Sequence, residues 1–233
     1  MLLTPTKEEI CLGNEFDALE EAREKRYFPS NASVYHFHPI AFVEQMKLIV
    51  IKEDIDLRPL MTFKSQAKGS TNCGTIARNI VAQVDNIYAM PSSAGKGHAY
   101  FQLCIENSKA TGLIFNKEKS IKAIDYIDRA LEYGHPVRAG VNHTLGNKIN
   151  EDDYPTTDHY VVIVGRKYIQ GILYYQYWDV GTFRGQSEHY RFELVDGYKL
   201  INTNANAGKG KDGRTYTVSQ IARNKLNKKI LDY

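Results

Sequence analysis

The sequence has few cysteines and no CxxC pair. Its three cysteines, Cys11, Cys73 and Cys104, are widely spaced and odd in number, so they do not make a disulfide framework. The lack of a CxxC pair also argues against a cysteine-rich zinc site. This usage is typical of a chain that folds in a reducing compartment.

Long apolar runs and a strong charge of either sign are also missing. No run approaches the roughly 20 apolar residues that a membrane span needs, so stable membrane insertion is not expected. The first residues lack the basic, apolar and small-residue series of a signal peptide, which leaves export without a cleaved signal open. A formal net charge of +3 over 233 residues gives no indication of nucleic-acid binding.

The hydrophobic pattern changes near residue 60 and divides the chain into two parts. Residues 1–59 predict a helical accessory segment, and residues 60–233 predict one larger domain. Apolar residues at helical spacing predict helices over 75–85 and 119–133 of that domain, and Gly134 is the expected stop of the second helix.

The second half of the larger domain predicts a sheet. Runs rich in β-branched and aromatic residues predict strands over 135–142, 159–168, 171–180 and 189–201. The stretch over 218–230 predicts a closing basic helix. Helices followed by a mostly antiparallel sheet predict an α+β fold.

Cys73 stands at the predicted start of the first of these helices, in the stretch GSTNCG. The free N–H groups and the dipole of a helix start favour the thiolate, which is the attacking form of cysteine. Small neighbours let a substrate carbonyl approach, and the Cys73 N–H can donate into an oxyanion hole. These features favour a nucleophile over a packing residue, whereas Cys104 is predicted to lie in the core and no role is assigned to Cys11.

Among the seven histidines, His159 is the best candidate for a base, because it opens the apolar run HYVVIVG. Asp179 ends the next predicted strand. A hairpin whose turn is centred on Ile169 would place these two residues opposite each other, so that the carboxylate fixes the imidazole tautomer. The alternative is a histidine that caps a strand and an aspartate that starts a turn.

Further polar residues are candidates for ligands or hydrogen-bond donors. Gln66 is the best candidate for a second oxyanion donor, with Ser70 and Asn72 as alternatives. His36 and His38 form an HxH pair, but no third ligand is near in sequence, so no metal site is predicted. The stretch SSAGKGH lacks the spacing of a phosphate loop, and no cofactor is predicted.

The motifs NCG, HYVVIVG and YWDVG, in this order and spacing, resemble the papain-like cysteine peptidase superfamily, in particular bacteriocin-processing peptidases and cell-wall amidases. The resemblance covers about residues 60–185. It implies a papain-like fold, in which N-terminal helices carrying the nucleophile at a helix start pack on the sheet. Residue by residue, it implies Cys73 as nucleophile, His159 as base, Asp179 as orienting acid and, one residue farther from the cysteine than usual, Gln66 as oxyanion donor.

A second stretch, VYHFHPIAFVEQM, resembles the segment that precedes toxin modules in bacterial polymorphic and type VI secretion effectors. It implies an antibacterial peptidoglycan amidase or endopeptidase. Such a protein is made in the bacterial cytoplasm, exported to act in a target cell or its periplasm, and paired with an immunity protein. The alternatives are a protease or deamidase acting on a protein, a non-catalytic binding module on this scaffold, or an unrelated α+β interaction domain.

Overall fold

The computed structural model describes residues 53–90, 99–146, 156–205, 214–227 and 229–233. The chain divides into two units, Met1–Lys52 and Glu53–Tyr233. Most of the predicted accessory segment, with the His36–His38 pair and Cys11, therefore lies outside the described residues. Residues 53–59, which the prediction assigned to that segment, belong to the second unit.

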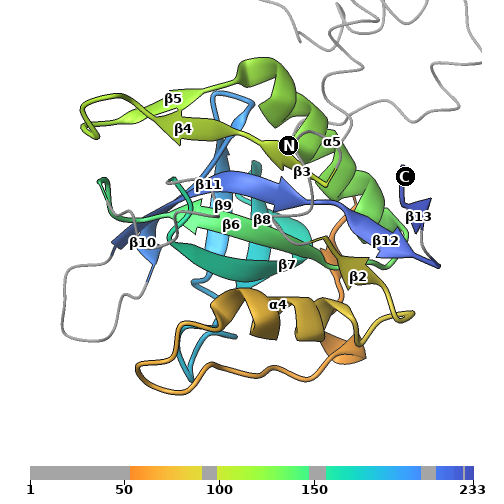
Figure 1. Cartoon of the computed structure of the whole chain (residues 1–233). Coiled ribbons are helices and arrows are strands. Elements are labelled where there is room, and N and C mark those ends of the chain that lie inside the picture. The colour runs from red at the N-terminus through yellow and green to blue at the C-terminus, as the bar shows by residue number, and fades with distance from the viewer. Residues whose placement is uncertain (1–52, 91–98, 147–155, 206–213, 228) are drawn as a thin grey trace, which may run out of the picture. The chain divides into compact units, whose positions relative to one another are not determined.

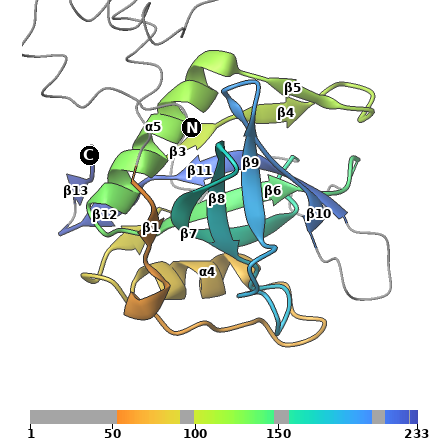
Figure 2. The ribbon, with the colours of Figure 1, turned by 180° about the vertical axis from the view of Figure 1, so that it is seen from behind.

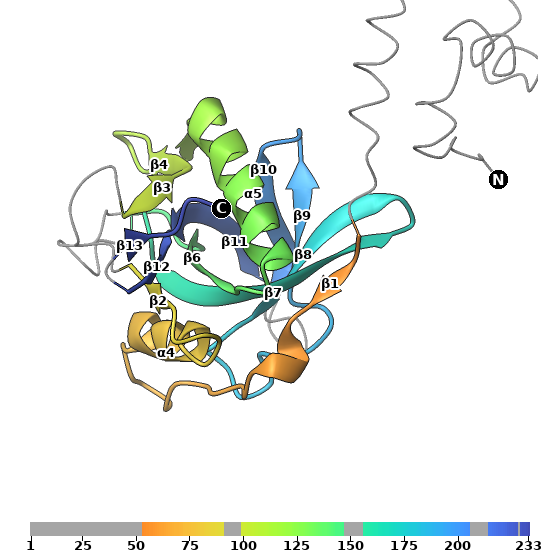
Figure 3. The ribbon, with the colours of Figure 1, turned by 90° about the vertical axis from the view of Figure 1, so that its right-hand side faces the viewer.

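The described unit is built on a closed barrel of six antiparallel strands (Figures 1 and 3). Each strand pairs with the next, and the last pairs with the first. In chain order the strands are β6 (Val137–Asn142), β7 (His159–Ile169), β8 (Ile172–Trp178), β9 (Arg191–Val195), β10 (Lys199–Ala205) and β11 (Arg214–Ala222).

Shorter elements extend this barrel. β1 (Ile55–Asp56) lies along β7 (Figure 2), and β3 (Tyr100–Gln102) pairs with β11. Two small sheets lie apart from these strands. They are made by β4 (Cys104–Glu106) with β5 (Leu113–Phe115), and by β12 (Asn224–Leu226) with β2 (Tyr88–Ala89) and β13 (Lys229–Ile230).

Two α-helices and one short 3-10 helix, η2 (Arg58–Leu60), are present in the described residues. α4 (Cys73–Val81) and α5 (Lys117–Glu132) correspond to the two helices predicted over 75–85 and 119–133. The side chain of Asn116 accepts a hydrogen bond from the Lys119 N–H at 3.0 Å and so caps α5. Gly134 follows this helix with φ of +80°, a conformation that glycine adopts without strain.

The two faces of β7 belong to different hydrophobic clusters. Val161 and Ile163 pack with the buried side of α5 and with the inward residues of the other barrel strands. Val162 and Val164 alternate with them and pack with α4. α4 and α5 accordingly lie on opposite sides of this strand (Figure 1).

The predicted fold class is wrong. The protein is mostly β, with a closed six-stranded barrel in place of a papain-like α+β fold in which helices pack on a sheet. The predicted helix over 218–230 is one source of the error, because Val218, Ile221 and Ala222 have the spacing of a helical stripe. These residues instead lie in β11, where pairing with β6, β10 and β3 satisfies the backbone and buries every side chain from Tyr216 to Ala222.

Within the described ranges, no helix combines the length and the apolar character that crossing a membrane requires.

Candidate active site

The β7–β8 hairpin brings His159 and Asp179 together. The turn is made by Gln170 and Gly171, both at positive φ, and not by residues centred on Ile169. The pairing also shifts at a bulge near Gly165. Continuing the pairing of Ile163 with Tyr177 places His159 opposite Gly181.

The predicted direct opposition of His159 and Asp179 is therefore wrong, but both side chains still lie on the same face of the hairpin. His159 precedes Val161 by two residues, and Asp179 follows Tyr177 by two, so both continue the inward face of the barrel. His159 Nε2 lies 2.8 Å from Asp179 Oδ1. The fit is tight at Gly181, because a Cβ there would lie 3.0 Å from both side chains and would make them shift.

Asp179 is fully buried and strongly held. Its Oδ1 also accepts the Gly181 N–H at 2.8 Å, and its own N–H donates to the Gly185 carbonyl at 2.7 Å. Burial acts to raise the pKa of this carboxyl, but the hydrogen bond and charge of His159 outweigh it and hold the pKa below the usual value. Asp179 is thus a carboxylate at neutral pH.

Cys73 is the first residue of α4 and is half-buried. Burial acts to raise its thiol pKa. The hydrogen bond and charge of His159, and the N–H groups of Tyr160 and Gly74, outweigh burial and lower that pKa. Because His159 Nε2 is bonded to Asp179, Nδ1 is the ring nitrogen left to face the thiol.

The pKa of His159 is changed by both of its neighbours, Asp179 and Cys73. Burial acts to lower its pKa, but Asp179 and Cys73 together raise the pKa of His159 to about 9. A raised imidazole pKa beside a lowered thiol pKa favours a thiolate–imidazolium pair near neutral pH.

The close approach of α4 to β7 depends on Gly74. A Cβ at this position would lie 3.1 Å from the Tyr160 ring and 3.7 Å from the Arg138 guanidinium. This guanidinium, which comes from β6, also lies 4.5 Å from the centroid of the Tyr160 ring. Neither Arg138 nor Tyr160 was singled out in the sequence, although the glycine directly after Cys73 was a signal that something packs tightly there.

The backbone of Gln66 lies next to the residues that follow Asp179. Its N–H donates to the Val180 carbonyl at 2.7 Å, so Gln66 runs alongside the residue that follows Asp179. Its side-chain Oε1 is buried without a hydrogen-bond partner among the described residues. Of the alternatives, Ser70 donates its hydroxyl to Asn72 Oδ1 at 2.5 Å, which uses the hydroxyl proton of Ser70.

We expect Cys73 and Cys104 to differ sharply in alkylation by iodoacetamide. Cys73 should react readily below about pH 8 because its thiol pKa is lowered. Cys104 is buried, and burial raises its pKa to about 12, so it should react only after unfolding. Peptide mass spectrometry over a pH series measures each cysteine separately. Equal rates at Cys73 and Cys104 in the folded protein would contradict the assignment.

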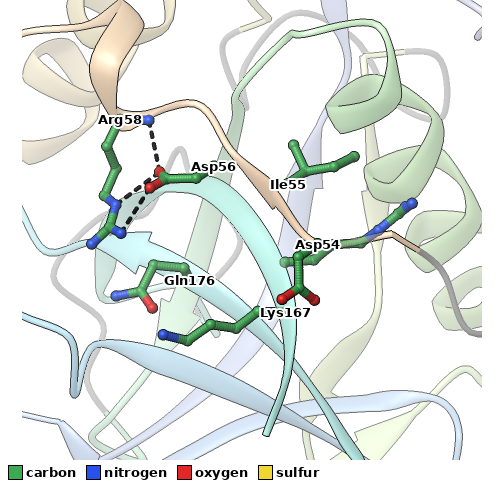
Figure 4. Close-up of a pocket in the computed structure, with 7 residues that line it drawn as sticks. Asp54, Ile55, Asp56, Arg58, Lys167 and Gln176 are labelled. Carbon is green, nitrogen blue, oxygen red and sulfur yellow. Dashed lines mark hydrogen bonds and ion pairs between the residues drawn. The ribbon is translucent and has the colours of Figure 1, made fainter.

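A separate polar pocket of about 160 Å³ lies between β1, β7 and β8 (Figure 4). Arg58 forms ion pairs there with Asp56, at 2.8 Å, and with Glu188, which also pairs with Lys167 at 2.9 Å. None of Cys73, His159 and Asp179 lines this pocket. In the part of the chain that the structure describes, no three His, Cys, Asp or Glu side chains are grouped as metal ligands.

The candidate active site is thus a Cys73–His159–Asp179 arrangement at one end of a β-barrel, with the helix start supplied from outside the barrel. Comparison of the chain with protein-family models, with curated proteins and with solved structures finds no match.

Proposed function

We propose that this protein is a cysteine hydrolase that cleaves amide bonds through Cys73, His159 and Asp179. The observation that carries the proposal is the 2.8 Å contact between His159 Nε2 and Asp179 Oδ1, which leaves the opposite ring nitrogen for a cysteine at a helix start. A nucleophile, a base and a group that orients the base are the three parts that covalent acyl transfer needs.

In the proposed reaction the Cys73 thiolate attacks the carbonyl carbon of the scissile amide. The negative charge that develops on oxygen is stabilised by the Cys73 N–H at the start of α4 and by the Gln66 amide. His159 gives its Nδ1 proton to the leaving nitrogen as the C–N bond breaks, and a thioester remains. His159 then takes a proton from water, the resulting hydroxide attacks the thioester, and the C–S bond breaks to restore the thiolate.

The proposed substrate is the peptide part of peptidoglycan. This step rests on the sequence resemblances, to cell-wall amidases in the motifs around Cys73 and His159, and to secreted effectors in residues 34–46. The proposal includes export without a cleaved signal peptide and an immunity protein that protects the producing cell.

Digestion of purified peptidoglycan with the wild-type protein and with Cys73→Ala tests this function. New fragments from the wild type alone, identified by mass spectrometry, would support the proposal and identify the bond cut. No fragments, with Cys73 still alkylated rapidly, would reject peptidoglycan and direct the search to protein substrates for a protease or deamidase. No fragments and an unreactive Cys73 would reject the hydrolase and favour a binding module.

Asp179→Ala should leave a small residual activity, about 10²–10⁴-fold below the wild type, because the base remains while its tautomer and orientation are lost. The alkylation midpoint of Cys73 should move to higher pH, since His159 loses the partner that raises its pKa. Turnover and alkylation measured on the same preparation check both effects. Loss equal to that of Cys73→Ala, without any shift in alkylation, would show a structural defect instead.

A further inference from the structure

Tyr216 lies on the inward face of β11, two residues before Val218, and only 4% of its surface is exposed. Its hydroxyl donates to Asp179 Oδ2 at 3.3 Å. The other carboxylate oxygen, Oδ1, receives His159 Nε2 and the Gly181 N–H. Tyr216 therefore supplies a donor to the oxygen that His159 does not use.

The Tyr216 ring also packs against the site. Its centroid lies 6.0 Å from that of His159 in an edge-on arrangement, and 5.5 Å from that of His143, on which it stacks. On the barrel side it stacks with Tyr177 at 6.4 Å. The ring is thus fixed from three directions, which holds the hydroxyl in place against Asp179.

We propose that Tyr216 is a positioning residue that fixes the Asp179 carboxylate and, through it, the charged pair of Cys73 and His159. The role in turnover rests on the proposed hydrolase function. The effect on the charged pair does not, because it is a property of the protein without substrate. Without this donor the Asp179 carboxylate is free to rotate away from His159 Nε2, so the imidazolium is held less well.

Other titratable groups face this carboxylate and could account for its properties. Tyr177 in β8 and Tyr190 before β9 lie near Asp179, but the Tyr177 hydroxyl accepts from Asn202 Nδ2 at 3.0 Å. His143, on the far side of the Tyr216 ring, lies 3.9 Å from the Asp158 carboxylate. Tyr177→Phe is consequently a matched control, since it removes a buried hydroxyl from the same face of the barrel without removing a bond to Asp179.

The test compares Tyr216→Phe with Tyr177→Phe in the alkylation of Cys73 by iodoacetamide over a pH series. Tyr216→Phe should raise the alkylation midpoint by about one pH unit, because one charge-assisted hydrogen bond is lost. Tyr177→Phe should leave the midpoint unchanged, even if both variants unfold at lower temperature. On a cleaved substrate, Tyr216→Phe should lower kcat roughly tenfold and leave KM unchanged.

An unchanged midpoint in folded Tyr216→Phe, or an equal shift in both variants, would overturn the assignment. If Tyr216→Phe does not fold, 3-fluorotyrosine at position 216 keeps both the ring and the donor, and the midpoint should then stay at the wild-type value. Movement of the midpoint to higher pH with this residue would also overturn the assignment. A shift in alkylation without activity on any substrate would keep the positioning role and reject the hydrolase.

Discussion

Cys73→Ser is expected to lower turnover by at least about 10³-fold, although serine fills nearly the same space. The thiol pKa at this position is lowered by His159 and by two backbone N–H groups, so the attacking anion forms near neutral pH. A serine hydroxyl does not ionise under the same influence, and the site holds no stronger base than His159 among the described residues. The rate of substrate cleavage, set against the Cys73→Ala background, measures the loss.

Cys104→Ser is the control for this substitution. Cys104 is buried in β4, with its sulfur 3.8 Å from the Val218 carbonyl, and is not part of the Cys73–His159–Asp179 group. Its replacement should lower the melting temperature and leave turnover per folded molecule unchanged. The nucleophile assignment would fail if Cys73→Ser kept a substantial part of the wild-type rate while Cys104→Ser lost it.

Gly185→Ala is expected to destabilise the protein by about 3 kcal/mol and to reduce activity at the same time. A Cβ at position 185 would lie 1.7 Å from the Asp179 carbonyl oxygen and 2.6 Å from its carbon, and backbone atoms cannot move aside cheaply. The segment is closed by hydrogen bonds from the Asp179 N–H to Gly185 and from the Gly185 N–H to Thr182. Relieving the clash therefore displaces the residue that orients His159.

Denaturant unfolding and Cys73 alkylation measure the two parts of this prediction. Gly112→Ala is the matched control, because the nearest atom to its Cβ would be 3.7 Å away, an ordinary contact distance. It should change neither quantity. A Gly185→Ala variant that is as stable as Gly112→Ala would show that the 179–185 segment rearranges freely and does not hold Asp179 in place.

The sequence allowed local elements to be predicted better than their assembly. The stripe of Ile76, Ile80 and Val81 marks α4, and the long apolar run from His159 marks β7. Closure of the barrel depends on β11 returning to β6, a pairing between segments far apart in the chain that no local pattern encodes. Because β11 is paired on both sides and buried throughout, it lacks the alternation that would have separated it from a helix.

The site was predictable to a different degree at each residue. His159 and Asp179 stand out because they lie at the ends of adjacent strands. The turn was predicted at the wrong residues, but the two side chains still meet because the bulge near Gly165 keeps both on one face of the hairpin. Tyr216 and Arg138 could not be found in the same way. Each is one of many tyrosines or arginines, and only the barrel brings them to Asp179 and to the Tyr160–Gly74 contact.

The residues of the proposed chemistry come from the two different faces of β7. The histidine and its acid belong to the barrel interior, whereas the cysteine arrives on a helix that packs against the outside of the same strand. A change at position 73 therefore leaves the barrel, its buried proton-handling pair and the surrounding surface in place. A variant with another residue at this position would therefore keep the surface around the site and lose the proposed cleavage, so a single substitution would turn the proposed hydrolase into a binding protein on the same scaffold.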